Sequence, residues 1–596
     1  MTRRWLPGIL AALVAILALT AGGAWLLVEL TVDAELLERI AGDLLAGTSG
    51  GLYGVEIGDL DKSLVRGGVV ARDVRLRADP EARRRLVEEG AAPALQFELH
   101  VDEVGLEGVD LLRLAWRRDL VADRFFVESP RLRVLAQQQL VGTPSTAEEE
   151  DRRLRERAAP EPGDTLHQRV ARGLPHVAVD RIDIEDVALS LKSLSEDGAE
   201  ALPGEDTRPR DTGPDGAAGS GTSTAEERIE GISIHLRDLR VDPDSAGDPE
   251  RVLYSEDVLL EIDRYARLLG GGSHEVEVGP IRASTGDGTF RFERLAYRPT
   301  SSESEFLDRA GGPDDRVEVE AGPVRVTGMQ YRRLIERLHL VADSLLIERL
   351  ELSVLEDERK QDSDPGGRPG MPHDFFQSLG TLLQVEAVEL GRGRVSYAER
   401  AADGARPGQI TFAGISGRIT NVTNDPDRMS PASPAVAELR ARVEGDGGAD
   451  LRLRWELPLL SPRPTMSYSG RLEEFDARLL NSLLPDLEGM RIRDGHVSWL
   501  EFDVRVDPAV ATGAVTGIYR DLSVSFEDKA TGGRSLGDRL KSFAANTFAI
   551  RGDSEPGPDG HPRNRGRVRY ELRPDDPFFA VVWKALRSGL LDLVKR

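Results

Sequence analysis

The chain contains no cysteine in 596 residues. This absence excludes a disulfide framework, a thiolate metal site and a cysteine nucleophile. The nine histidines are scattered, and they form neither an HExxH motif nor a close pair that would hold a metal. No glycine-rich nucleotide loop stands between an expected strand and an expected helix. The sequence therefore predicts no metal and no cofactor, and we expect a protein that is not an enzyme.

Positive charge is in deficit, because 78 Lys and Arg residues stand against 103 Asp and Glu residues, for a formal charge of −25. Nucleic-acid binding needs clustered cations against phosphate, so we expect no nucleic-acid partner. Aromatic residues are also few, at 5%, whereas hydrophobic residues make up 40% and glycine occurs 61 times. This composition is typical of a folded chain with many turns.

One serine carries the spelling of a nucleophile elbow, Gly47-Thr-Ser49-Gly-Gly51. That elbow requires a strand before the serine and a helix after it. Here the expected helix comes first, with apolar residues at helical spacing after Asp33. We therefore interpret the motif as a turn that ends the helix. An exported hydrolase is the weakest functional hypothesis for this chain.

Long uncharged runs are absent except at the start, where Leu6 to Val28 carries no charged side chain over 23 residues. As a helix this run is about 35 Å long, enough to cross a hydrocarbon core of about 30 Å. Arg3 and Arg4 precede it and acidic residues follow it, which places the short tail in the cytoplasm. The predicted membrane-anchor residues are Leu6, Ile9, Leu10, Leu13, Ile16, Leu17, Trp25, Leu26 and Val28.

A cleaved secretory signal is the alternative for this run. Ala21 and Ala24 satisfy a small-residue cleavage rule, although signal h-regions usually span only about 7 to 15 residues. An uncleaved single-pass anchor is favoured by the length. Both interpretations place the body of the chain outside the cytoplasm.

The body is dominated by a recurring pattern in which two short apolar-x-apolar alternations are separated by a break. Within each half the spacing is two, which is typical of strands. Across the break the apolar positions shift by an odd number, so one sheet face is kept only if the chain bulges or turns there. The pattern occurs in residues 125–134, 182–189, 290–295, 345–352 and 388–397.

We therefore predict a mainly β protein: an N-terminal transmembrane helix, then an elongated, curved, mostly antiparallel sheet, groove-like or sandwich-like, with a few short helices. Short helices are expected at Gln330 to Leu340 and at Ala477 to Leu484. Segments rich in Pro, Gly and charge lack the apolar residues that would offset ordering entropy. The predicted parts are 1–30 (tail and anchor), 31–142 (helix and β region), 143–228 (polar, partly disordered insertion with a β segment at 177–191), 229–357 (middle β region), 358–374 (linker), 375–577 (second β region) and 578–596 (amphipathic helix).

The last segment has an apolar stripe at helical spacing with Lys584 and Arg587 beside it. A cationic, aromatic-rich terminal helix suits a lipid interface. Docking on the end of the sheet as a cap is the alternative, and the two are compatible. The residues predicted to face the lipid interface are Phe578, Phe579, Val582, Trp583, Leu586, Leu590 and Leu593.

Several stretches carry a family resemblance. They are Gly54-Val-Glu-Ile57-Gly-Asp-Leu60, Val127-Glu-Ser-Pro130-Arg-Leu-Arg-Val134, Gly517-Ile-Tyr519-Arg-Asp521-Leu522-Ser-Val524 and Phe578-Phe579-Ala-Val-Val-Trp583-Lys584. Together with the anchor, they resemble the AsmA-like proteins of diderm bacterial envelopes. The resemblance implies a single-pass inner-membrane protein with its C-terminal body in the periplasm. It also implies an architecture related to bridge-like lipid carriers, in which a curved sheet forms an apolar groove.

Two functional hypotheses follow. The first is a non-enzymatic envelope protein that takes part in lipid handling or transport, or in outer-envelope assembly, by binding phospholipid or other acyl chains in an apolar β groove. The second is a structural scaffold or assembly factor with a closed β-sandwich core that binds envelope proteins. Few helices are expected to cover the sheet, so its apolar face must meet either another sheet or acyl chains.

Overall fold

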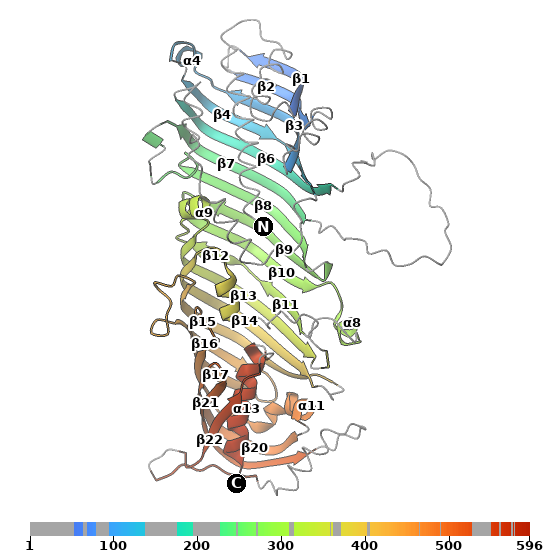
Figure 1. The fold of residues 1–596 in the computed structure, drawn as a ribbon, viewed down its shortest axis with the longest axis vertical. Coiled ribbons are helices and arrows are strands. Elements are labelled where there is room, and N and C mark those ends of the chain that lie inside the picture. Colours follow the sequence, from blue (N-terminus) through green and yellow to red (C-terminus); the bar gives the residue numbers. More distant parts are fainter. Residues whose placement is uncertain are drawn as a thin grey trace, which may run out of the picture. The chain divides into compact units, whose positions relative to one another are not determined.

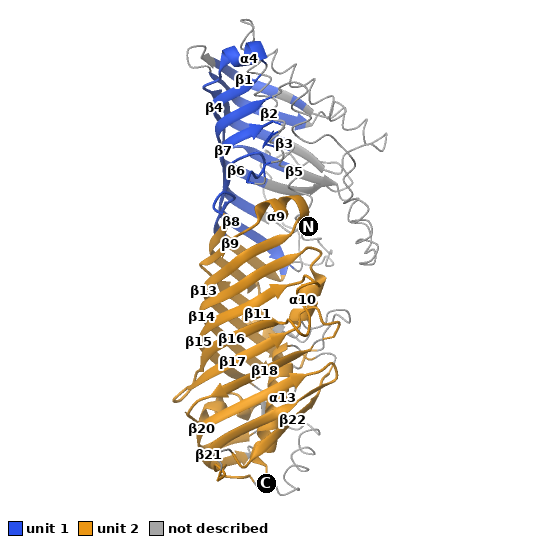
Figure 2. Ribbon diagram, turned by 90° about the vertical axis from the view of Figure 1, so that its left-hand side faces the viewer, with its two compact units in different colours: residues 1–272, 279–287 blue, residues 273–278, 288–596 orange. Residues whose placement is uncertain are grey.

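The computed structural model is mostly β, and its described residues form 22 strands in one mixed sheet with a few short helices (Figure 1). This confirms the mainly β class predicted from the alternating pattern. The chain divides into two compact units, unit 1 with residues 1–272 and 279–287, and unit 2 with residues 273–278 and 288–596 (Figure 2). The structure describes residues 53–63, 68–78, 95–117, 119–137, 176–194, 227–242, 244–245, 248, 250–269, 272–308, 315–357, 359–360, 371–401, 406–463, 465–488, 490–526, 550–558, 562–573, 576 and 578–595.

Unit 1 is built on strands in which apolar residues stand opposite one another. Phe125 pairs with Leu106 on one side and with Ile182 on the other, so the three side chains share one face. That face is a buried core. The pairings are antiparallel except that β4 and β5 run parallel to β6. The elements are β1 (Tyr53–Ser63), β2 (Gly68–Ala78), β3 (Leu95–Glu107), α4 (Leu111–Arg117), β4 (Leu120–Glu128), β5 (Arg131–Gln137), β6 (Val177–Leu194), β7 (Glu227–Val241) and β8 (Asp257–Leu269).

Unit 2 continues with the same kind of strand. Strand β9 (His274–Ser284) contributes residues to both units. The pairings described for unit 2 are antiparallel except β13 with β14, which is parallel. The strands are β10 (Thr289–Pro299), β11 (Asp315–Ala321), β12 (Val324–Thr327), β13 (Leu340–Asp357), β14 (Leu383–Arg400), β15 (Gly408–Thr423), β16 (Ala435–Val443), β17 (Ala449–Leu457), β18 (Met466–Leu472), β19 (Phe475–Asp476), β20 (Met490–Val506), β21 (Val510–Phe526) and β22 (Arg565–Glu571). The helices are α8 (Glu303–Asp308), α9 (Tyr331–Arg337), α10 (Pro372–Ser378), the 3-10 helix η4 (Ala477–Ser482), α11 (Leu484–Glu488) and α13 (Phe578–Val594).

Three of the five predicted breaks coincide with a positive-φ residue or a register shift. Ser129, between β4 and β5, has φ 49°, and Asp186 within β6 has φ 56°. The register of β6 against β7 shifts between Ile184 and Val187, and that of β14 against β15 shifts after Leu390. The extra residues in β6 and β14 keep the apolar side chains before and after them on one face. The odd spacing in the sequence is therefore explained.

One internal repeat was not predicted from the sequence. The motif Leu-Val-Ala-Asp opens β4 at residues 120–123 and β13 at residues 340–343. In both copies the residue before the preceding helix donates its N–H to the carbonyl oxygen of the motif's valine at 2.9 Å. Gly108 and Gly328, with φ 67° and 65°, lie so close to the motif's aspartate that a Cβ would overlap it. The two units thus start one strand in the same way.

The helix predictions are met in part. Helix α9 lies inside the predicted 330–340 segment, and α13 confirms the C-terminal helix. The segment 477–484 is split into η4 and α11. Helix α4 was not predicted, and α10 begins within the predicted linker at 358–374.

Several predictions fall on residues outside the described ranges. These are the anchor at 1–30, the helix after Asp33, the Gly47 to Gly51 turn, and most of the polar insertion. Among the described residues, no helix is at once long enough and apolar enough to span a membrane.

Candidate functional site

The strand register of unit 2 aligns apolar side chains into rows that cross the sheet. Leu345 stands opposite Val326 on one side and Val388 on the other, and directly opposite residues share a face. We call the face that carries these rows the apolar face of unit 2. One row is Phe290, Val326, Leu345, Val388, Ile419, Ala437, Trp455, Tyr468 and Val504. The next is Phe292, Val324, Ile347, Leu390, Gly417, Leu439, Leu453, Gly470, Phe502 and Val515.

Burial changes along this face. In strands β17 to β22 the row members Tyr468, Phe502 and Val515 are buried in a core cluster. In strands β10 to β15 most large apolar side chains of the same face are only half-buried. They include Phe290, Phe292, Leu345, Ile347, Leu352, Val388, Leu390 and Val395. The end of the apolar face near β22 is therefore enclosed, while the part formed by β10 to β15 keeps partial solvent access in the described structure.

Helix α13 encloses the strands near the C-terminus. Val581, Ala585 and Leu593 are buried against the sheet. The hydroxyl of Tyr468 donates to the Val582 carbonyl oxygen at 3.0 Å. The Phe578 ring lies 5.5 Å from that of Trp455, centre to centre. The helix thus docks on the sheet, as in the cap interpretation.

The residues predicted for a lipid interface lie along this docked helix. Leu593 is buried, and Phe579 is half-buried with its ring 6.0 Å from that of Tyr397. The remaining five pack against the core cluster while half-buried: Phe578, Val582, Trp583, Leu586 and Leu590. Their contact with lipid stays a prediction. The predicted anchor residues, Leu6 to Val28, lie outside the described residues.

A buried carboxylate fastens the start of α13. Asp576 accepts hydrogen bonds from the Tyr570 hydroxyl at 2.6 Å and from Lys584 Nζ at 2.8 Å. Burial raises the pKa of the Asp576 carboxyl, but the hydrogen bonds from Lys584 and Tyr570 outweigh burial and leave that pKa below its usual value. The ionised carboxylate therefore ties the helix to β22 at neutral pH.

A polar cluster marks one border of the apolar face. The Tyr397 hydroxyl lies 2.8 Å from a carboxylate oxygen of Glu356 and 2.9 Å from one of Glu399. All three side chains are buried. Burial, followed by the two nearby carboxylates, raises the pKa of Tyr397 well above its usual value. The phenol therefore stays protonated and serves as a donor.

Unit 1 carries a separate polar network on the face opposite its core. Asp183 accepts hydrogen bonds from Arg124 Nε at 2.7 Å and contacts His235 Nδ1 at 3.0 Å. Burial raises the pKa of Asp183, but the bonds from His235 and Arg124 outweigh it and lower the pKa overall. Asp183, Glu185 and His235 lie close enough to share a metal ion. Because Arg124 already neutralises Asp183, we interpret the group as an ion-pair network.

The sequence alone predicted that His235 is a surface or strand residue. Its partners Asp183 and Arg124 come from two other strands, so only the pairing of β4, β6 and β7 reveals the network. The apolar rows were visible as alternation, but their continuity across strands needed the register. No protein-family model matches this chain, and no curated protein is similar enough to it to count as a match.

Proposed function

We propose that this protein is a non-enzymatic, membrane-anchored envelope protein that handles lipid by binding acyl chains along the apolar face of unit 2. The observation that carries the proposal is the contrast in burial along that face. Tyr468, Phe502 and Val515 are buried in the core cluster that α13 joins, whereas most large apolar side chains of the face in β10 to β15, apart from the buried Val324 and Val326, are half-buried. A broad apolar sheet face in water requires a partner sheet, a helix or a ligand.

Acyl chains suit such a face because they need no specific polar pocket. Each buried CH₂ contributes about 0.8 kcal/mol, so one chain along the rows would be held firmly. The bulge after Leu390 favours a curved sheet in unit 2, which would form a groove. The resemblance to AsmA-like proteins supports the same function, with an anchor at Leu6 to Val28 in the inner membrane and the body in the periplasm.

Copurified lipid tests the proposal. The full chain should carry phospholipid detectable by mass spectrometry after extraction from detergent. Leu352→Asn should reduce the bound lipid several-fold, because Leu352 lies on the apolar face opposite Val395. Leu346→Asn is the matched control, since Leu346 is also half-buried on β13 but stands opposite Glu389 on the polar face. Equal lipid content in both variants and the unsubstituted chain would contradict the proposal.

A scaffold or assembly factor for envelope proteins is the second candidate. The enclosed core of β17 to β22 with α13 favours it, because those strands need no lipid to complete their packing. A chain that purifies free of lipid and captures no acyl chains would fit this candidate.

A further inference from the structure

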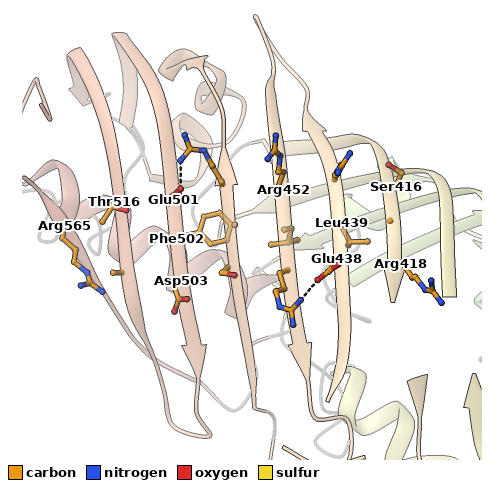
Figure 3. Close-up of a pocket in the computed structure, with 18 residues that line it drawn as sticks. Ser416, Arg418, Glu438, Leu439, Arg452, Glu501, Phe502, Asp503, Thr516 and Arg565 are labelled. Carbon is orange, nitrogen blue, oxygen red and sulfur yellow. Dashed lines mark hydrogen bonds and ion pairs between the residues drawn. The ribbon is translucent and has the colours of Figure 1, made fainter. Parts of the chain in front are cut away.

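The polar side of the sheet in unit 2 carries a cavity of about 910 Å³ over strands β15 to β22 (Figure 3). Along β17, Leu451 and Leu453 belong to the apolar side, so Arg452 and Arg454 between them point to the opposite side. The cavity runs between two rows of such polar-side residues. Its arginines are Arg418, Arg440, Arg452, Arg454, Arg471 and Arg565, and its acids are Glu438, Glu501 and Asp503. Arginine is thus concentrated here in a chain whose overall charge is −25.

One row places like charges directly opposite one another. Arg440 on β16 stands opposite Arg452 on β17, and Arg452 stands opposite Arg471 on β18. We call these three residues the arginine row. Like charges in directly opposed positions destabilise a sheet. The neighbouring row alternates sign instead, with Glu438 between Arg418 and Arg454. The arginine row therefore costs stability that an ordinary solvated sheet face avoids.

Neutralisation of the arginine row is incomplete. Arg471 is satisfied by Glu501 and by Glu473, and its guanidinium lies 4.7 Å from the centre of the Trp499 ring. The nearest carboxylate to Arg452 is Glu473 at 3.9 Å. The guanidinium groups of Arg418, Arg440 and Arg565 make no hydrogen bond or ion pair with any residue that the structure describes. Several guanidinium groups around the cavity therefore have hydrogen-bond donors to spare.

Small residues line the cavity together with Leu439, Leu453 and Phe502 of one apolar row. Among the small residues, Ser416 stands opposite Arg440, Ser469 opposite Arg454 and Thr516 opposite Arg565. Their size leaves room for a ligand, and the hydroxyl groups add donors. Guanidinium forks form paired hydrogen bonds with phosphate oxygens, and a phosphate carrying up to about two charges offsets adjacent cations well.

We propose that this cavity binds a phosphate-bearing ligand, held chiefly by Arg440 and Arg452. The arginine side chains point to the face opposite the apolar rows, so phosphate binding does not depend on acyl-chain binding. The phosphate comes either from a soluble compound or from a lipid headgroup, and the two sources share the same recognition chemistry.

Titration of the full chain with inorganic pyrophosphate at low salt, followed by calorimetry, tests the site. The unsubstituted chain should bind, and the double variant Arg440→Gln/Arg452→Gln should bind at least tenfold more weakly. Arg442→Gln is the matched control, because Arg442 lies two residues from Arg440 and is neutralised by Asp450. Its affinity should stay within twofold. Absence of pyrophosphate binding, or equal binding by the double variant, would overturn the proposal.

Two further measurements test whether the double variant is folded and which class of anion the cavity binds. The double variant should melt at the same temperature as the unsubstituted chain or higher, because it relieves repulsion. If it melts lower, Arg565→Gln, at the far end of the cavity, replaces it in the titration with the same expectation of weaker binding. Displacement of pyrophosphate by equimolar citrate would show a general anion site and would overturn the phosphate assignment.

Vesicle binding distinguishes a lipid headgroup from a soluble phosphate compound as the ligand. Phosphatidylcholine vesicles containing phosphatidic acid should be retained by the unsubstituted chain and released by the double variant if the ligand is a headgroup. Pyrophosphate binding that depends on Arg440 and Arg452, without such vesicle binding, assigns a soluble phosphate.

Discussion

Gly566 on β22 and Gly589 on α13 lie so close that a Cβ on Gly566 would come within 2.0 Å of the Gly589 carbonyl oxygen. The obstacle is backbone, which cannot swing aside as a side chain can. Only hydrogen at both positions lets the helix reach the strand at this distance. This contact explains how α13 buries the rows of β20 to β22.

We predict that Gly566→Ala weakens the docking of α13. The added methyl group overpacks the contact and should cost about 1–3 kcal/mol, seen as a lower melting temperature and faster hydrogen exchange in α13. Gly380→Ala is the control, because a Cβ there meets nothing within 4 Å. Unchanged exchange in α13 would show that the helix is not held at Gly566.

We predict that Tyr468→Phe destabilises the same contact by about 0.5–1.5 kcal/mol. The substitution keeps the buried ring and removes only the hydrogen bond from the hydroxyl to the Val582 carbonyl oxygen. Hydrogen exchange of α13 should accelerate. The docked geometry would be contradicted by a variant whose α13 exchanges as slowly as before.

The docking of α13 on the sheet should weaken at acid pH, because the Asp576 carboxylate becomes protonated there. Its pKa in the folded protein is below the usual 3.8, so the carboxylate contributes stability that is fully present above about pH 4–5. That contribution is lost as pH falls further, through the lowered pKa. We predict that Asp576→Asn is less stable than the unsubstituted chain at pH 7 and that the gap closes below pH 4. Thermal unfolding at each pH measures the gap, and Asp507→Asn, at an exposed position, is the control substitution.

The backbone conformation of Asp186, at the bulge in β6, can be tested by substitution. With φ 56°, Asp186 occupies the left-handed region, which glycine adopts freely and β-branched residues avoid. We predict that Asp186→Gly is at least as stable as the unsubstituted chain, while Asp186→Val loses about 1–3 kcal/mol. Asp180→Val, in the same strand but outside the set of positive-φ residues, should cost far less. Equal losses at both positions in thermal unfolding would argue against the bulge.

The spacing of apolar residues along the chain was enough to predict the strands and their breaks. Phe125, Val127 and Leu132 show the spacing of two and then an odd shift, and the structure places the bend between them at Ser129. The terminal helix was predicted from its stripe of apolar residues, because a spacing of three and four is a local property.

Pairing was not predictable, because it joins residues that are distant in sequence. Nothing near Leu345 indicates that it stands opposite Val388 on a parallel neighbour, and the apolar face exists only through such registers. The arginine row has the same origin, since Arg440, Arg452 and Arg471 come from three strands. Helix α4 was missed because it is short and leaves Leu112 and Trp116 exposed, at 76% and 87%, without an apolar stripe.

The most direct measurement of acyl-chain binding compares neighbouring residues on the two faces of β13. A photoreactive benzoylphenylalanine would replace Leu345 on the apolar face or Leu346 on the polar face, and the full chain would be irradiated in cells. The account predicts a lipid adduct, identified by mass spectrometry, at Leu345 and none at Leu346. Adducts at neither position, or equally at both, would contradict it.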